Sequence, residues 1–232
     1  MAYKIKFDKF FSYSFSLDCV IFGYENGKIH VLLIKRAMEP FLGEWAIPGD
    51  LVYPDEDLSD AASRILIELT KVEGVMLHQG QTFGKPDRHP QGRVITNAYF
   101  ALVRKEDIYA VADSWAEEVK WLPIREIPQL AFDHNEILKS TFELLCQKLK
   151  REPLCFDLLP EKFTLNEMQQ LYEYSFDSSL DKANFRKKIR PIPLINLNEK
   201  QKNVKHRPAN LFKFDSERYS ELVEEDNYLF RM

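Results

Sequence analysis

The sequence predicts an α+β protein of two domains, in which a mixed sheet between helices precedes a smaller domain of helices and a β-hairpin. Three observations lead to this prediction. Up to about residue 150, β-rich runs alternate with segments of helical periodicity. Residues 151–163 then contain two prolines and no periodicity, as a linker would. Regular patterns restart at Thr164, so we place the domains at 1–150 and 151–232.

The first two strands are predicted at 16–24 and 28–36, which are rich in β-branched and aromatic residues. Asn26-Gly27 between them is a strong signal for a tight hairpin turn. The loop 37–50 contains Pro and Gly residues that interrupt regular structure. Apolar residues at three- and four-residue spacing then predict a helix over 57–70.

Three more strands are predicted at 79–84, 93–103 and 117–123, with a turn-rich loop at 85–92. Residues 133–152 have helical periodicity over about five turns. This helix closes the first domain.

Two helices are predicted to open the second domain. Thr164 and Glu167 have the spacing of a capping box, which predicts a helix over 164–176. Asp181 is a second candidate N-cap, and it predicts a helix over 181–190 that ends before a proline.

Strand-like runs at 193–198 and 209–215 follow, separated by a polar, basic segment. Phe185 and Ile189 lie four residues apart and are expected to form the buried side of the second helix. A helix, a turn, a basic helix and a hairpin in this order predict a winged helix-turn-helix.

A local excess of positive charge lies in this domain, although the formal net charge of the chain is −4. Residues 182–213 contain ten basic side chains against one acidic residue, Glu199, whereas 214–232 contain six acidic residues against two arginines. On this scaffold, such a segment favours binding to double-stranded operator DNA. The alternative is a solvated lysine-rich face.

The second helix of a helix-turn-helix enters the major groove with its N-terminal residues on base edges. Lys182, Asn184 and Arg186 occupy that end, where Asn favours adenine and Arg or Lys favours guanine. The other basic residues of this helix and of the wing would contact the DNA backbone or the minor groove: Lys187, Lys188, Arg190, Lys200, Lys202, Lys205, His206 and Arg207. For each lysine alone a solvated charge is the more frequent explanation, and His206 could equally be structural.

The composition, 45% apolar and 29% charged, is that of an ordinary soluble globular protein. No run of about 18 apolar residues predicts a membrane span. The N-terminal segment 1–15 does not resemble a secretion signal. Cys19, Cys146 and Cys155 have neither metal-ligand spacing nor the even number of a disulfide framework. We therefore expect a cytoplasmic protein without a metal or cofactor.

Residues 45–72 resemble the signature of Nudix hydrolases, in which a Gly and a Glu precede the motif Arg-Glu-x-x-Glu-Glu at fixed spacing. Glu56, Arg64 and Glu68 fall in register, but the Gly position holds Asp50. Two Glu positions hold Ile65 and Leu69, so the three carboxylates that would converge on Mg²⁺ are reduced to one. One carboxylate cannot build a metal-activated hydrolase site, which predicts that the chain is not an enzyme. The alternative is an enzyme with relocated ligands among nearby carboxylates, namely Asp50, Asp55, Glu56, Asp57 and Asp60.

Beyond this box, the chain is similar to the Nudix-related transcriptional regulators of the NrtR family. The segments 83–103, 158–176, 180–189 and 205–214 carry the resemblance. It implies a Nudix-like α/β/α sandwich that senses a small molecule, a C-terminal winged helix and a homodimer that binds operator DNA. Members of the family bind ADP-ribose or related nucleotides, whereas one branch senses L-arabinose, and the whole chain resembles that branch most.

In a Nudix fold the ligand would lie between the N-terminal strands, the box loop and the loop 83–97. The candidate effector-binding residues are therefore Arg36, Trp45, Asp50, Lys85, Asp87 and Arg93. Our leading hypothesis is a repressor of L-arabinose utilisation genes that releases its operator when the sugar binds. The alternatives are an ADP-ribose-sensing regulator of NAD metabolism and an active Nudix pyrophosphohydrolase.

Overall fold

Strand β1 (Ser14–Glu25) forms the centre of the larger sheet in the computed structural model, which describes residues 13–202, 204, 207–225 and 229–232. It turns into β2 (Lys28–Arg36) through Asn26 and Gly27. Both turn residues have positive φ, 50° and 78°, which Asn and Gly tolerate better than other residues do. The predicted hairpin is confirmed.

The larger sheet has seven strands and a mixed topology. Its main path runs β3-β2-β1-β6-β5, while β4 pairs with β1 and β7 pairs with β2. The remaining bounds are β3 (Trp45–Ala46), β4 (Gly49–Leu51), β5 (His78–Phe83), β6 (Val94–Arg104) and β7 (Ala116–Pro123). The predicted strands all appear in it, with ends shifted by one or two residues.

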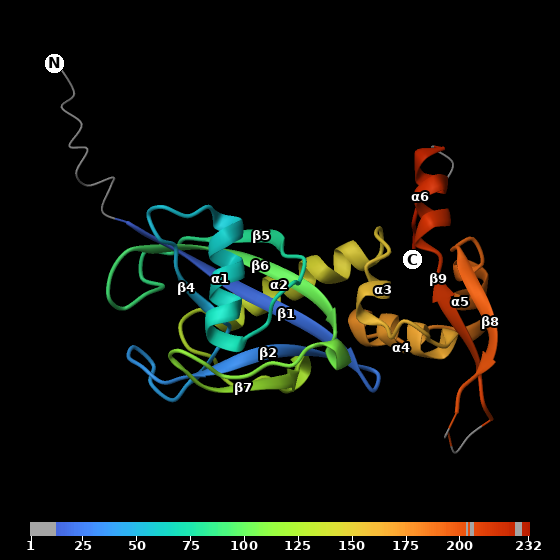
Figure 1. Ribbon diagram of the computed structural model, residues 1–232, viewed down its shortest axis with the longest axis horizontal. Coiled ribbons are helices and arrows are strands. Elements are labelled where there is room, and N and C mark those ends of the chain that lie inside the picture. The colour runs from blue at the N-terminus through green and yellow to red at the C-terminus, as the bar shows by residue number, and fades with distance from the viewer. Residues whose placement is uncertain (1–12, 203, 205–206, 226–228) are drawn as a thin grey trace. The chain divides into compact units, whose positions relative to one another are not determined.

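Two helices flank this sheet, α1 (Leu58–Thr70) in front and α2 (His134–Leu149) behind it (Figure 1). Short 3₁₀ helices lie at Lys105–Asp107 and Ile124–Glu126. The apolar face of α1 is buried because its small and branched residues recur at helical spacing: Ala61, Ala62, Ile65, Leu66 and Leu69. The predicted α+β class with a mixed sheet between helices is thus confirmed.

A helix-turn-helix and a two-stranded hairpin follow (Figure 1). Helix α4 (Leu165–Phe176) starts with the predicted capping box, and α5 (Lys182–Ile189) starts at the predicted N-cap, Asp181. The hairpin consists of β8 (Leu194–Lys200) and β9 (Asn210–Phe214), and α6 (Ser216–Glu224) follows it. Helix α6 was not predicted from the sequence. It lies beyond residue 214, where the last segment that resembles the NrtR family ends.

The prediction of a structureless linker at 151–163 is wrong. Residues Cys155–Leu158 form a short helix, α3, in which Cys155, Phe156 and Leu158 are buried. The Phe156 ring stacks on Phe214 of β9 with 4.0 Å between the ring centroids. Four residues are too few to show helical periodicity, so this anchoring segment resembled a linker in the sequence.

Internal contacts divide the chain into two compact units. The first contains residues up to Ile21, Val31–Ala101 and Ile108–Phe142, and the second contains Phe22–His30, Leu102–Asp107 and Glu143–Met232. The second unit thus includes the β1–β2 turn, and the domain boundary near residue 150 stays a prediction. Among the described residues, no helix has the length and apolar character needed to cross a membrane.

Replacement of Thr164 by Ala should lower the free energy of unfolding by about 1 kcal/mol. The Thr164 hydroxyl accepts a hydrogen bond from the Glu167 N–H at 3.1 Å, and the Glu167 carboxylate accepts one from the Thr164 N–H at 2.6 Å. Urea unfolding followed by circular dichroism measures the change. Ser63→Ala, at an exposed position of α1, is the control, and equal midpoints for both variants would contradict the role of the cap.

Candidate functional site

The first unit contains a cavity of about 550 Å³ at the end of the sheet where β1 begins. Strands β1 and β4 supply its floor, and the loops after β2 and before β6 supply its walls. The polar and aromatic residues that line it include Ser16, Asp18, Arg36, Asp50, Arg88, His89, Arg93, Trp115, Phe132 and His134. The cavity thus combines cationic, anionic and aromatic groups.

A buried carboxylate, that of Asp18, lies on the cavity floor. Its Oδ2 accepts a hydrogen bond from the Thr96 hydroxyl at 2.8 Å, and its Oδ1 lies 3.3 Å from Nε2 of His134. Burial alone would raise the pKa of Asp18, but His134 and Arg88 together with these hydrogen bonds hold it below its usual value. Asp18 is therefore ionised at neutral pH.

The hydrogen bonds of His134 fix its tautomer. The backbone N–H of Ile47 donates to Nδ1 at 3.0 Å, so Nδ1 carries no proton in this arrangement. The proton of the neutral ring is therefore on Nε2, where it points to Asp18. Both nitrogens are occupied, which makes His134 a support for the carboxylate rather than a free base.

Gly49 of β4 pairs with Asp18 in the sheet. A Cβ atom at position 49 would overlap the Asp18 carboxylate and lie 2.8 Å from the backbone oxygen of Leu17. Position 49 therefore has to be glycine for β4 to approach β1 this closely.

Arg88 bridges two carboxylates. Its Nε and one Nη donate to both oxygens of Asp133 at 3.0 and 2.7 Å, and the same Nη lies 3.5 Å from Asp18. The Arg88 side chain is only 3% exposed. This bidentate pair connects the loop before β6 to the start of α2 and leaves one negative charge in excess on the floor.

Arg36 differs from Arg88 because it forms no direct ion pair with a described residue. Its guanidinium lies 4.9 Å from the centroid of the Trp115 ring and 5.0 Å from that of Phe132, and its Nε donates to the Pro40 carbonyl at 2.7 Å. In the described part of the chain, no carboxylate lies within 4.0 Å of it. Burial lowers the pKa of Arg36, while Asp50 acts in the opposite direction. An anion in the cavity would supply the missing charge.

The aromatic walls are held in place by neighbouring groups. Asp50 accepts hydrogen bonds from Nε1 of Trp115 at 3.3 Å and from the Leu51 N–H at 2.7 Å. His89 stacks on Phe132 with 5.1 Å between the ring centroids. Burial lowers the pKa of His89, and the nearby arginines lower it further, so the ring is neutral at neutral pH. Flat rings beside a cation suit a ligand with a planar base and an anionic group.

Of the signature positions of the Nudix-like box, only Asp50 lines this cavity. Ile65 and Leu69 are buried in the core. Arg64 binds Glu56 at 2.7 Å and Glu68 at 3.0 Å, and it also donates to the Leu51 carbonyl at 2.9 Å. The two retained glutamates therefore neutralise Arg64. The described residues contain no group of three or more His, Cys, Asp or Glu side chains placed to hold a metal ion.

The structure brings together three of the six predicted effector-binding residues. Arg36, Asp50 and Arg93 line the cavity, although Arg93 donates to the Gly84 and Lys85 carbonyls and thereby closes the preceding turn.

The other three predicted residues do not line this cavity, and their role in effector binding stays a prediction. Lys85 is exposed and pairs with Glu136 at 2.6 Å, Asp87 is exposed on the same turn, and Trp45 belongs to β3. Sequence proximity to the box and the turn did not show which way these side chains point.

Several lining residues were missed in the sequence. Asp18 interrupts an otherwise apolar strand, which is a usable signal for a buried functional carboxylate. Arg88 and His89 lie in the loop 83–97, beside which the ligand was expected, but other residues of that loop were chosen as candidates. Trp115, Phe132 and His134 lie in segments without a motif, and only the fold brings them to the cavity.

The predicted DNA-binding surface is centred on α5. Phe185 and Ile189 are buried, as predicted, and all six polar candidates of this region are exposed: Lys182, Asn184, Arg186, Lys187, Lys188 and Arg190. In the hairpin, Lys200, Lys202 and Arg207 are also exposed. Lys205 and His206 lie outside the described residues. The structure thus places the described candidates on solvent-accessible surface.

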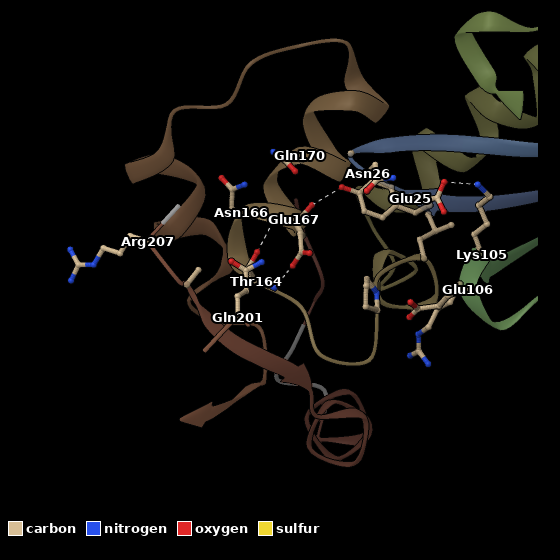
Figure 2. A pocket seen from close by; sticks show the side chains of 16 residues that line it. Glu25, Asn26, Lys105, Glu106, Thr164, Asn166, Glu167, Gln170, Gln201 and Arg207 are labelled. Carbon is tan, nitrogen blue, oxygen red and sulfur yellow. Dashed lines mark hydrogen bonds and ion pairs between the residues drawn. The ribbon is translucent and has the colours of Figure 1, made fainter. Parts of the chain in front are cut away.

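A second cavity, of about 680 Å³, lies within the second unit (Figure 2). It is lined by the β1–β2 turn, the start of α4 and residues of the loop between β8 and β9, namely Gln201, Arg207 and Ala209. Glu25 binds Lys105 at 2.5 Å beside it. Its exposed groups are mainly amides and paired charges, which do not define a ligand.

Comparisons with known proteins agree with this architecture. The NUDIX domain family matches residues 15–144, and the NrtR DNA-binding winged helix domain matches residues 155–214. The ADPR responsive transcriptional repressor NtrR of Acinetobacter baylyi is 31% identical over 208 residues, which are 88% of this chain and 83% of that protein.

Comparison with solved structures also agrees with this architecture. NrtR of Shewanella oneidensis complexed with a 27mer DNA is 29% identical with a TM-score of 0.72, over 93% of this chain and 97% of that chain. The NUDIX domain of the same Shewanella protein complexed with ADP ribose is 31% identical with a TM-score of 0.56, over 60% of this chain and 92% of that chain.

These matches define the class of protein, a NUDIX effector domain joined to a DNA-binding winged helix. The chain belongs to the NrtR family of transcriptional regulators. The predicted family and fold are confirmed.

Replacement of Asp18 by Asn should destabilise the protein at pH 7 and much less in acid. Folding lowers the pKa of Asp18, so its ionised form stabilises the folded state. This stabilisation is fully present at pH values above the pKa of Asp in the unfolded chain, which is about 3.9. The stabilisation is lost as the pH falls through the lower pKa that Asp18 has in the folded protein. Unfolding free energies of both proteins measured between pH 7 and 3 should therefore converge below about pH 4.

Asp55→Asn, at an exposed loop position, is the control and should follow the wild type at every pH. A constant difference between Asp18→Asn and the wild type down to pH 3 would contradict the assignment of an ionised, stabilising Asp18.

Proposed function

We propose that this protein is a transcriptional repressor that releases operator DNA when ADP-ribose binds in the cavity of its NUDIX domain. The observation that carries the proposal is the buried guanidinium of Arg36, which lies between the rings of Trp115 and Phe132 and forms no direct ion pair with a described residue. The diphosphate of ADP-ribose would supply the missing negative charge, and its adenine could stack on an aromatic wall. The relatives named for ADPR and crystallised with ADP ribose support this choice.

L-arabinose, the effector favoured in the sequence analysis, fits the cavity less well. The sugar is uncharged, so it would leave Arg36 buried without a counter-ion, at a cost in binding free energy. The findings therefore favour the ADP-ribose alternative. Because ADP-ribose is a fragment of NAD, we expect the regulated genes to serve NAD metabolism.

The DNA-binding part of the proposal rests on the exposed basic side of α5 and on the family of the winged helix. We further propose a cytoplasmic homodimer, since two copies of α5 would read two half-sites about one helical turn of DNA apart or a multiple of that distance.

An active pyrophosphohydrolase is the less favoured alternative. Glu56 and Glu68 are both engaged by Arg64, and the neighbouring signature positions are filled by the buried Ile65 and Leu69. We expect ADP-ribose to remain intact during incubation with the protein and Mg²⁺ or Mn²⁺, as followed by product chromatography. Turnover that Glu68→Gln abolishes would show an enzyme instead.

ADP-ribose should raise the melting temperature of the full-length protein in a thermal-shift assay, whereas L-arabinose should leave it unchanged, because only a ligand that prefers the native state stabilises it. Arg36→Met should weaken ADP-ribose binding at least about tenfold in calorimetry, since it removes a charge-assisted contact.

Lys85→Met removes an exposed cation outside the cavity and should bind ADP-ribose as the wild type does. The effector assignment fails if L-arabinose stabilises the protein and ADP-ribose does not. It also fails if Arg36→Met binds ADP-ribose as tightly as Lys85→Met does.

Substitutions on α5 should separate base recognition from phosphate contact. The probe is a duplex enriched from a randomised pool by the full-length protein without ADP-ribose. Arg186→Ala should weaken binding by about 1–3 kcal/mol and relax the preference at one base pair. Lys188→Ala should weaken binding to all sequences and lower the salt slope by about one.

Lys139→Ala, at an exposed position of α2 in the first unit, is the matched control. Wild-type affinity and salt dependence of both α5 variants, measured by fluorescence anisotropy, would place the DNA-binding surface elsewhere.

A further inference from the structure

The floor of the effector cavity has a row of polar side chains on one strand. Successive residues of a strand point to opposite faces, so Ser14, Ser16 and Asp18 of β1 share one face, and all three line the cavity. Ser14 is exposed, whereas Ser16 is only 9% exposed and Asp18 only 4%. The row therefore leads from the surface of the first unit to the buried end of the cavity.

Ser16 has a buried hydroxyl that no described residue engages. Its backbone oxygen accepts a hydrogen bond from the Thr96 hydroxyl at 3.0 Å, but its own hydroxyl forms no hydrogen bond with a described residue. A hydroxyl can donate one hydrogen bond and accept two, and burial of such a group without a partner is unfavourable. Position 16 therefore suits a ligand that brings a polar group into the cavity.

A donor and an acceptor lie on the same floor. Nε and one Nη of Arg88 bind Asp133, while its Nη1 forms no hydrogen bond with a described residue. The ionised Asp18 has about four acceptor positions, and Thr96, His134 and Arg88 leave at least one of them open. The floor thus presents a carboxylate acceptor, a guanidinium donor and a hydroxyl that can act as either.

Neighbouring hydroxyl groups of a sugar ring match this set. Each sugar hydroxyl can donate to the carboxylate while it accepts from the guanidinium or from the serine. The rings of Phe132 and His134, with 5.2 Å between their centroids, add flat surface against which the carbon face of a sugar can pack. A phosphate group fits less well, because the negative charge in excess on the floor repels it.

ADP-ribose contains two ribose rings, and the closed end of the cavity distinguishes between them. The ribose of the adenosine carries the base on C1, whereas the terminal ribose carries only a hydroxyl there. Strands β1 and β4 close the floor, since a Cβ atom at Gly49 would already overlap Asp18 and approach the Leu17 backbone. This end of the cavity therefore suits the unsubstituted end of the ligand.

We propose that the floor is a specificity subsite, in which Ser16, Asp18 and Arg88 bind the hydroxyl groups of the terminal ribose of ADP-ribose. Arg36 binds the diphosphate, so the two parts of the ligand have separate partners. The inference rests on the proposed function for the identity of the ligand. It adds that the protein rejects adenine nucleotides that lack the terminal ribose, and it names Ser16 as a residue that determines this selectivity.

Calorimetry with two ligands of equal charge tests the subsite. ADP-ribose is compared with the methyl ester of ADP, which keeps the adenosine and the diphosphate but has a methyl group in place of the terminal ribose. We expect the wild type to bind ADP-ribose at least about tenfold more tightly, because a site with buried polar groups rejects an analogue without the matching hydroxyls.

Ser16→Ala should lower this preference about threefold to tenfold, since it removes one hydrogen bond to the ribose, and should leave the Kd of the ester within about twofold. Its urea midpoint should equal that of the wild type, because the lost hydroxyl has no partner among the described residues. Asp18→Asn, used at a pH where circular dichroism shows it folded, should lower the preference as well. Ser63→Ala, at an exposed position of α1 outside the cavity, is the control and should keep it.

Equal affinity of the wild type for the two ligands would overturn the inference and leave the proposed effector standing. An equal loss of affinity for both ligands in Ser16→Ala would also overturn it, because the serine would then contact the part that the ligands share. The same holds if folded Ser16→Ala and Asp18→Asn both keep the wild-type preference. A wild type that binds neither ligand would refute the proposed effector and the subsite together.

Discussion

The ionised carboxylate of Asp18 is the interaction on which the effector domain depends. A buried carboxylate destabilises a fold unless it is paired and hydrogen-bonded. Here its partners come from three separate parts of the chain, namely Thr96 of β6, Arg88 of the preceding loop and His134 at the start of α2. One charge therefore fixes the floor and two walls of the cavity, and β4 can close on it only because position 49 is glycine.

The two arginine clusters of this domain have opposite consequences. Arg64 is bound within the protein by Glu56 and Glu68, which connects α1 to the loop before it. Arg36 is buried between aromatic rings, and among the described residues no carboxylate lies within 4.0 Å of it, although Asp50, Glu39 and Asp18 lie farther off, so an anion in the cavity would find it without a direct ion pair.

Periodicity and local chemistry predicted most of the fold, because hairpin turns, helix caps and amphipathic helices are encoded by neighbouring residues. The capping box at Thr164 and the turn at Asn26 are examples. The cavity was predicted only in part, since Trp115 and Phe132 reach it through tertiary packing that no local pattern encodes. The short helix at Cys155–Leu158 was missed because one turn shows no period.

In the proposed function, ADP-ribose and operator DNA compete through one conformational equilibrium of the protein. The most direct test is to measure the Kd of ADP-ribose for the full-length protein, free and saturated with the enriched duplex. Linkage requires that DNA weaken ADP-ribose binding by the same factor by which ADP-ribose weakens DNA binding, about fivefold or more for a functional switch. Equal affinity of ADP-ribose for the free and the DNA-bound protein would contradict this competition.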